Sequence, residues 1–148
     1  MTAVSQLICS VIACLGFAII FNIQKDKLFW ACFGGFISWG VYLSAVACGL
    51  GDYLSAFIAA AVTTLYAELL ARVCKTPATV FVIVCTIPLL PGGALYRAMD
   101  YLVHHYKTTG ETEGIYAFCF AASMAAGIIC ATLTTRALLR PSSNTKQE

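Results

Sequence analysis

The sequence has few charged residues: aspartate, glutamate, lysine and arginine together make up 11% of its 148 residues. Hydrophobic residues make up 60%, which leaves too little polar surface to coat a water-soluble globule. This balance excludes a soluble catalytic domain and predicts an all-α integral protein of the lipid bilayer. At roughly 20 apolar residues per span, a chain of this length holds four or five membrane-spanning helices in one domain.

The sequence also lacks the residue patterns that carry catalysis. It has no paired acids, no set of serine, histidine and aspartate, no H-E-x-x-H motif and no phosphate-cradling loop. Its eight cysteines lie mostly inside apolar runs and form no C-x-x-C pair, so we interpret them as small apolar packing residues. The adjacent His104 and His105 point to different helix faces and have no third ligand nearby. We therefore expect no enzymatic activity, no metal site, no cofactor and no nucleic-acid partner.

The chain divides at its charged and turn residues into one membrane domain, residues 1–148. The first apolar run has no basic residue before it and no small-x-small cleavage site after it, so we expect a span rather than a cleaved signal peptide. Asp52 is predicted to cap the third span. The predicted spans are residues 4–22, 28–48, 53–73, 78–90 with a half-helix over 94–107, and 115–139, followed by a polar tail over 141–148.

The fourth predicted element is a broken helix at Pro91, Gly92 and Gly93. Only about 13 apolar residues precede Pro91, too few for a straight span. Pro88 and Pro91 lack a backbone donor and release carbonyl groups from the helix ladder. Unpaired backbone groups at membrane depth survive only where protein or a water-filled cavity receives them. In transporters, the free N-terminus of such a half-helix faces an anionic substrate group, so we predict that substrate binds at this break.

The half-helix after the break carries its charged residues on one stripe. Arg97, Asp100, His104 and Lys107 are spaced three, four and three residues apart, which gathers them on one helix face. One interpretation is that Arg97 and Asp100 face a substrate. The other is an amphipathic helix at the outer membrane surface, with an ion pair between Arg97 and Asp100. The residues alone leave both interpretations open.

Two further polar residues belong to the apolar runs. Glu68 precedes Arg72 by one helical turn, in the order that favours an ion pair. An ionisable group inside a span is also a candidate for coupling an ion, such as a proton, to transport. Asn22 ends the first run, where it either caps its helix or forms a hydrogen bond with substrate.

Basic residues are distributed unevenly between the two sides of a five-span arrangement. Because cytoplasmic loops retain lysine and arginine, the richer side is predicted to be cytoplasmic, with the N-terminus outside and the C-terminus inside. Arg97 and Lys107 fall on the poorer side. The residues on the richer side are Lys25, Lys27, Arg72, Lys75, Arg136, Arg140 and Lys146.

Small residues recur four apart along several spans. In lipid, helices associate by close backbone approach over small side chains, so these positions predict tight packing within the chain or against a partner subunit. The pairs and rows are Ala31/Gly35, Gly34/Ser38, Gly40/Ser44/Cys48, Ala56/Ala60/Thr64, Ala122/Ala126 and Ser123/Gly127/Ala131.

Three segments, in this order and spacing, resemble the small membrane subunit of the bacterial threonine/serine exporter family. They are GFAIIFNI at 16–23, AELLARVCKTPATVF at 67–81 and IPLLPGGALYRAM at 87–99. The most specific part is I-P-x-x-P-G followed by an aromatic residue, here Ile87, Pro88, Pro91, Gly92 and Tyr96.

The resemblance implies one half of a two-component carrier in the bacterial cytoplasmic (inner) membrane, acting with a larger membrane subunit. It also implies export of threonine and serine, or of small dicarboxylates such as succinate, driven by an ion gradient.

The predicted ion-coupling residue is Glu68. Alternatives are a non-transporting membrane scaffold or assembly subunit, and a homo-oligomer. The predicted substrate-binding residues are Pro91, Gly92, Gly93, Tyr96, Arg97, Asp100 and Asn22.

Overall fold

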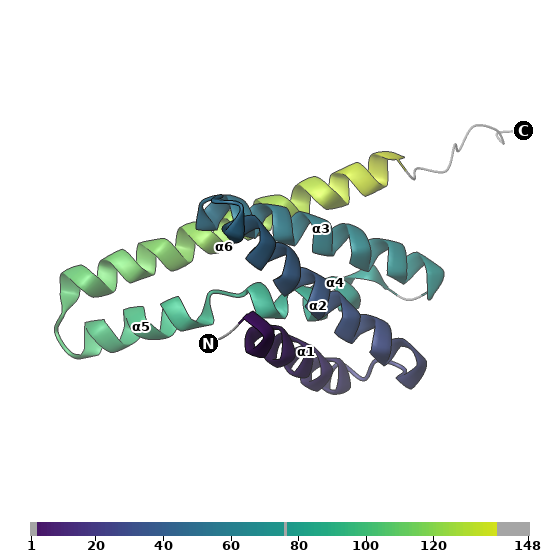
Figure 1. Ribbon diagram of the computed structural model, residues 1–148, viewed down its shortest axis with the longest axis horizontal. Helices are drawn as coiled ribbons and strands as arrows, with labels where there is room; N and C mark the ends of the chain where they lie inside the picture. The colour runs from purple at the N-terminus through teal and green to yellow at the C-terminus, as the bar shows by residue number, and fades with distance from the viewer. Residues whose placement is uncertain (1–2, 76, 139–148) are drawn as a thin grey trace, which may run out of the picture.

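The computed structural model describes residues 3–75 and 77–138, which form a bundle of helices (Figure 1). The described residues contain no strand, which confirms the all-α prediction. Arg140, Lys146 and the predicted polar tail lie outside them. The elements are α1 (Ala3–Ile20), α2 (Lys25–Ala47), α3 (Asp52–Val73), α4 (Ala78–Thr86), the 3-10 helix η1 (Ile87–Leu89), α5 (Gly92–Val103) and α6 (Lys107–Leu138).

Four of the helices, α1, α2, α3 and α6, are each long and apolar enough to cross a membrane. The segment α4–η1 and α5 together make a fifth candidate span, bent by 56° at the break between them. By length and composition, the structure therefore has four to five spans, in agreement with the prediction of about five elements with a broken fourth.

Three boundaries differ from the sequence prediction. α5 begins at Gly92 and ends at Val103, because His105 adopts a φ of 64°, which a helix cannot continue through. α6 begins at Lys107, so the segment before residue 115 is helical instead of a loop. Asp52 is the first residue of α3, with Gly51 at the N-cap, so the prediction that Asp52 caps this helix is wrong.

The core of the bundle lies around α3, which packs against α2, α4 and α6. Its buried positions are mostly alanine and threonine. The buried hydroxyls of Thr63 and Thr64 donate to the carbonyls of Ala59 and Ala60 at 2.7 and 2.8 Å, so they carry no unpaired donor into the core. Small and internally bonded side chains let the neighbouring helices approach α3 closely.

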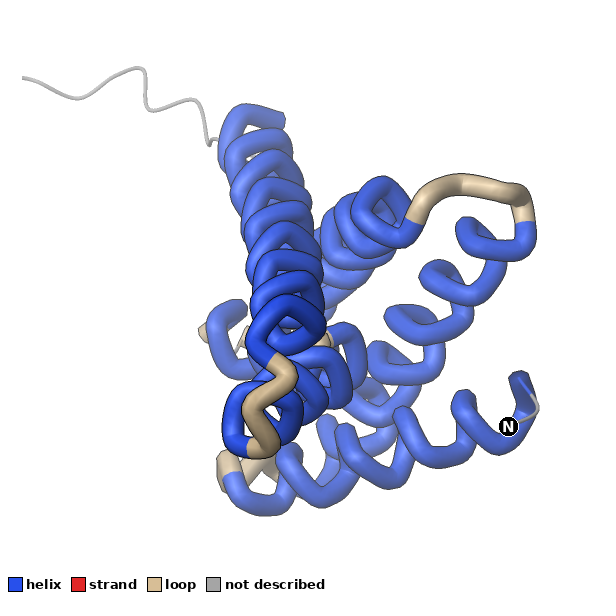
Figure 2. Tube along the Cα trace, turned by 90° about the vertical axis from the view of Figure 1, so that its left-hand side faces the viewer, coloured by secondary structure: helices blue, strands red, loops and turns tan. Residues whose placement is uncertain are grey.

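The short α5 packs against the first half of α6 as a helical hairpin, which extends beyond the ends of the other helices in Figure 1. Figure 2 views the molecule from that side, with the turn between α5 and α6 in front. Ala94 and Ala98 of α5 are buried in this contact, and Gly110 of α6 lies against Ala98. The outer face of α5 is apolar and exposed over Leu95, Met99 and Val103.

The predicted close packing over small residues is confirmed between α3 and α6. A Cβ atom added to Gly127 would overlap the Phe57 carbonyl of α3 and lie 3.2 Å from the Cβ of Ala60. Not every predicted small face is used within the chain, because Ala122 and Ala126 are exposed. The rest of the small-residue pattern on α6 therefore faces lipid or another chain.

Gly127→Ala should destabilise the protein, although alanine is the better helix former. The added methyl group meets backbone of α3, which cannot rotate away, and we expect a cost of about 1–3 kcal/mol. Gly16→Ala is the matched control, since no atom lies within 4 Å of a Cβ added there. It should be neutral or stabilising by up to about 1 kcal/mol. Thermal unfolding of both purified variants in detergent checks this, and equal melting temperatures would contradict the packing.

Candidate functional site

The break between α4 and α5 lies well inside the span. α4 has nine residues and η1 has three, which together rise roughly 20 Å from the start of α4. The hydrocarbon core of a bilayer is about 30 Å thick, so a span that begins near Ala78 breaks about two thirds of the way across. Polar groups released at that depth need partners.

The first released carbonyl is that of Val84, whose helical partner would be the missing N–H of Pro88. The thiol of Cys14 on α1 donates to it, with 3.3 Å between Sγ and the oxygen. Cys85 likewise donates to the Ala31 carbonyl of α2 at 3.7 Å. These two cysteines therefore do more than fill apolar space: their thiols bond backbone carbonyls of neighbouring helices around the break.

The second released carbonyl is that of Ile87, which the missing N–H of Pro91 leaves unpaired. It accepts a hydrogen bond from the Leu90 N–H at 3.1 Å, and the Leu90 carbonyl accepts one from Gly92 at 2.7 Å. The chain itself thus receives the released groups at these positions. This leaves the first turn of α5 as the part of the break that is open to a ligand.

The first turn of α5 is accessible from outside the chain. Gly92 and Gly93 are exposed, and no heavy atom lies within 4 Å of a Cβ added to Gly92. A Cβ on Gly93 would lie 3.6 Å from Nη1 of Arg97. The half-helix N-terminus and a guanidinium group are therefore next to each other on one open surface, and both attract a carboxylate.

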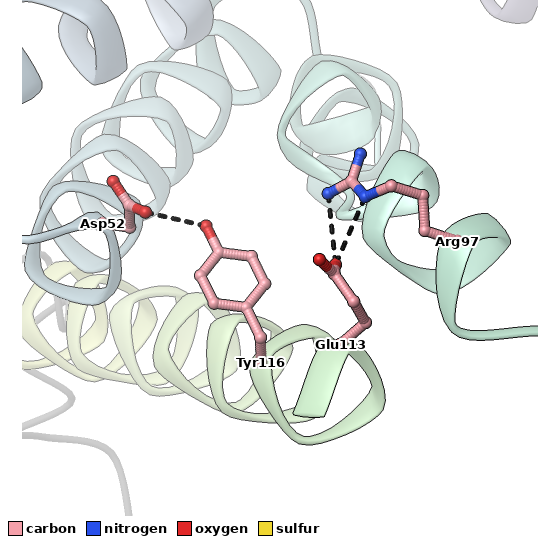
Figure 3. Close-up of polar contacts among 4 residues, drawn as sticks. All are labelled: Asp52, Arg97, Glu113 and Tyr116. Carbon is pink, nitrogen blue, oxygen red and sulfur yellow. Dashed lines mark hydrogen bonds and ion pairs between the residues drawn. The ribbon is translucent and has the colours of Figure 1, made fainter. Parts of the chain in front are cut away.

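Arg97 forms an ion pair with Glu113 of α6, with its Nη2 and Nε at 3.2 and 3.3 Å from the same carboxylate oxygen (Figure 3). The predicted alternative of an Arg97–Asp100 pair is wrong, because Asp100 instead lies beside His104, with 3.4 Å between Oδ1 and Nδ1. The side chain of Arg97 is 52% exposed. An exposed ion pair of this kind contributes only about 0–1 kcal/mol, so a ligand can displace Glu113 at small cost.

Sequence reasoning missed a second polar contact beside this pair. The Tyr116 hydroxyl on α6 donates to Oδ2 of Asp52 on α3 at 2.9 Å. Figure 3 shows that Tyr116 and Glu113 extend from neighbouring positions of α6 toward α3 and α5 respectively. Their three-residue spacing was visible in the sequence, but a partner 64 residues away was not. The two contacts join α3, α5 and α6 next to the break.

On its other side the break borders a small cavity of about 260 Å³, between α1, α2 and Pro88. Gln6, Ser10 and Trp39 line it, and the Trp39 indole N–H donates to Gln6 at 3.4 Å. The hydroxyl of Ser38, next to Trp39, is buried without a partner. Gln6, Ser10 and Trp39 did not stand out in the sequence, because single polar residues in apolar runs carry no spacing signal, and Ser38 was noted only as a small packing residue.

Glu68 lies at the opposite end of α4 from the break. Glu68 is only 8% exposed. It lines a cavity of about 340 Å³ together with Arg72, Lys75 and Arg136. Within the described part of the chain it forms no ion pair, so the predicted Glu68–Arg72 pair is absent. This cavity lies between the end of α3, the start of α4 and the end of α6.

The structure does not bring all the predicted substrate residues together. Pro91, Gly92 and Gly93 lie at the start of α5, and Arg97 lies beside Gly93. Asn22 lies in the turn after α1, near the end of the bundle where Lys27 donates to the Cys74 carbonyl. Its φ of 53° and its N–H bond to Ile19 are typical of a residue that ends a helix.

Tyr96 and Asp100 lie on α5, but neither faces the core. Tyr96 is 73% exposed, next to the apolar outer face of the helix. Asp100 is exposed one turn after Tyr96. Both positions can contact a ligand or a second chain only on the outside of the hairpin.

Comparison with known proteins identifies the family. The family described as "Threonine/Serine exporter, ThrE" matches residues 6–134, which is most of the chain. The chain belongs to the threonine/serine exporter family. A curated threonine/serine exporter of Corynebacterium glutamicum is 35% identical over 92 residues, which cover 62% of this chain and 19% of that protein. No solved structure matches.

The described residues contain no group of three or more side chains that could hold a metal ion. The chain spans about a fifth of the length of its curated relative, so most of that protein has no counterpart here.

Proposed function

We propose that this chain is one subunit of a secondary transporter that exports small metabolites bearing a carboxylate, together with a larger membrane subunit. Threonine and serine are the first candidates, because the family and the curated relative carry those names. Small dicarboxylates such as succinate are the second. The observation that carries the proposal is the family match over residues 6–134, combined with a helix broken at membrane depth.

The open first turn of α5 supports the choice of a carboxylate. Its N–H groups and positive dipole end lie beside Arg97, and both features favour a negative charge. A bidentate contact between a guanidinium group and a carboxylate would then replace the exposed ion pair with Glu113. Gly92 and Gly93 leave room for a ligand to approach the backbone.

The need for a larger subunit is supported by what this chain leaves uncovered. The outer face of α5 is apolar and exposed, and Ile115 and Phe118 of α6 are also 65% and 76% exposed. A broken span with one open side requires something to close it against lipid. In the longer relative, the sequence outside the matched region is available to cover this side.

Efflux from bacterial cells tests this function. Cells loaded with threonine from a threonine-containing dipeptide should release it faster when this chain and its larger partner are expressed together. A scaffold or assembly subunit would leave the release rate unchanged. The same cells loaded with succinate show which of the two substrate classes is exported.

The orientation of the chain is a further part of the proposal. With the N-terminus outside, Leu50 in the turn between α2 and α3 faces the outside and Ser143 faces the cytoplasm. In a background where the exposed Cys48 is replaced by serine, Leu50→Cys should react with an impermeant thiol reagent added to whole cells. Ser143→Cys should react only after permeabilisation. The reverse pattern would contradict the orientation.

A further inference from the structure

The cavity around Glu68 has an unusual charge arrangement. Its lining includes three basic side chains and one acidic side chain. Arg72, Lys75 and Arg136 are exposed, whereas Glu68 is buried. The basic groups therefore form the rim of the cavity and the carboxylate lies at its floor. The volume of about 340 Å³ is at the lower end of the range of roughly 300–1,000 Å³ that is typical of small-molecule sites.

Glu68 has no partner among the described residues, although a basic residue follows it by one turn. The structure records ion pairs at Arg97–Glu113 and at His104–Asp100, both on the α5–α6 hairpin. The negative charge of Glu68 is paired with no basic group of the described residues, so it offers a partner to a cationic group that enters the cavity. The cavity gives such a cation direct access to it.

A ligand for this cavity has to carry two opposite charges close together. A simple anion would be attracted by the basic rim but repelled by Glu68. A simple cation would be attracted by Glu68 but repelled by the basic rim. We propose that the cavity binds a free α-amino acid, with its ammonium group on Glu68 and its carboxylate on Arg72 or Arg136. Guanidinium groups bind carboxylates in a bidentate manner, and an ammonium group donates up to three hydrogen bonds.

The position of the cavity fits entry of substrate for export. It lies at the ends of α3 and α6 and the start of α4, on the side that the distribution of basic residues predicts to be cytoplasmic. The open turn of α5 lies further along the same broken span. The assignment of an amino acid as ligand rests on the proposed function.

A lipid headgroup offers the same chemistry, because phosphatidylethanolamine carries an ammonium group and a phosphate. The burial of Glu68 favours the smaller ligand, whose ammonium group is not tethered to acyl chains in the bilayer. The experiment therefore has to separate a free amino acid from a headgroup.

Binding of radiolabelled L-threonine to the full chain tests the inference. The purified chain is placed in phosphatidylcholine nanodiscs, without the larger subunit, since one chain forms the whole cavity. Unlabelled L-threonine should compete, whereas N-acetyl-L-threonine, L-threoninamide and succinate should not, because each lacks one of the two charges. Binding that survives the loss of either charge would overturn the inference, and so would the absence of binding.

Variants of the cavity give a second readout. Arg136→Gln should weaken threonine binding by roughly tenfold or more, and Arg136→Lys should recover part of it. Glu68→Gln should weaken binding of threonine and let N-acetyl-L-threonine compete, a change of selectivity that a merely structural role would not produce. Glu111→Gln, an exposed acid on the α5–α6 hairpin, is the matched control and should bind like the wild type. Unchanged selectivity in Glu68→Gln would overturn the assignment.

Phosphatidylethanolamine provides the lipid arm of the test. If the cavity takes an amino acid, adding this lipid to the nanodiscs should leave threonine binding unchanged. Loss of threonine binding on its addition would assign the cavity to a headgroup and overturn the inference. These experiments measure binding to one chain, so the chain can fail to bind threonine while cells still export it. Equally, the chain can bind threonine while cells fail to export it.

Discussion

Vesicles that contain this chain alone should show little or no saturable efflux of threonine, and efflux should appear when the larger subunit is added. No heavy atom lies within 4 Å of a Cβ added to Gly92 in the first turn of α5, and the outer apolar face of α5 is exposed. A carrier needs a pathway that is closed to lipid and alternately open to each side, which these spans do not enclose by themselves. We expect at least a tenfold difference in initial rate, measured with radiolabelled threonine at equal protein content.

The control for this experiment shows whether low efflux results from the absence of the larger subunit or from damage to the purified chain. The same purified preparation is divided, and one half is reconstituted with the larger subunit. If vesicles with the chain alone show full saturable efflux, the chain is a complete carrier, and a homo-oligomer becomes the favoured assembly.

Arg97→Ala should reduce export of a carboxylate substrate by roughly tenfold to a hundredfold in kcat/KM, whereas Lys107→Ala should have little effect. Loss of a hydrogen bond to a charged group costs about 1.5–3 kcal/mol, and every 1.4 kcal/mol is a factor of ten. Arg97 lies within two turns of the break, whereas Lys107 begins the next helix. Lys107 is a suitable control because it carries the same charge as Arg97 and is predicted to lie on the same side of the membrane.

The variant Arg97→Lys adds a test of geometry. A lysine keeps the charge but cannot form the bidentate contact, so we expect an intermediate rate. Loss of the ion pair with Glu113 alone would destabilise the hairpin slightly, and Glu113→Gln measures that effect. If Arg97→Ala and Lys107→Ala prove equally silent, Arg97 is a surface residue of the hairpin and does not bind substrate.

The sequence was informative wherever local chemistry determined the outcome. Pro88, Pro91 and the two glycines predicted the break, because proline removes backbone donors wherever it occurs. Gly127 belonged to a small-residue row that predicted close packing, and the structure places it directly against α3. The apolar runs predicted about five membrane elements, and the described residues contain four to five candidate spans.

The sequence was uninformative wherever a contact joins distant segments. The partner of Arg97 is Glu113, sixteen residues away on another helix, and spacing within one helix favoured Asp100 instead. Cys14 bonds the Val84 carbonyl across 70 residues, which no local pattern could reveal. Glu68 and Arg72 had the right spacing for an ion pair, but the described residues form no such pair.

Counterflow of radiolabelled threonine through vesicles that hold both subunits tests the central claim most directly, namely that this chain supplies the broken helix of an exporter. Wild-type vesicles preloaded with unlabelled threonine should accumulate the label transiently. Gly92→Leu should abolish this accumulation without impairing assembly, because no heavy atom lies within 4 Å of a Cβ added there and the side chain extends into the open space at the break. Gly16→Leu, equally free of contacts, should behave like the wild type. Undiminished counterflow in Gly92→Leu, or none in the wild type with both subunits present, would contradict the account.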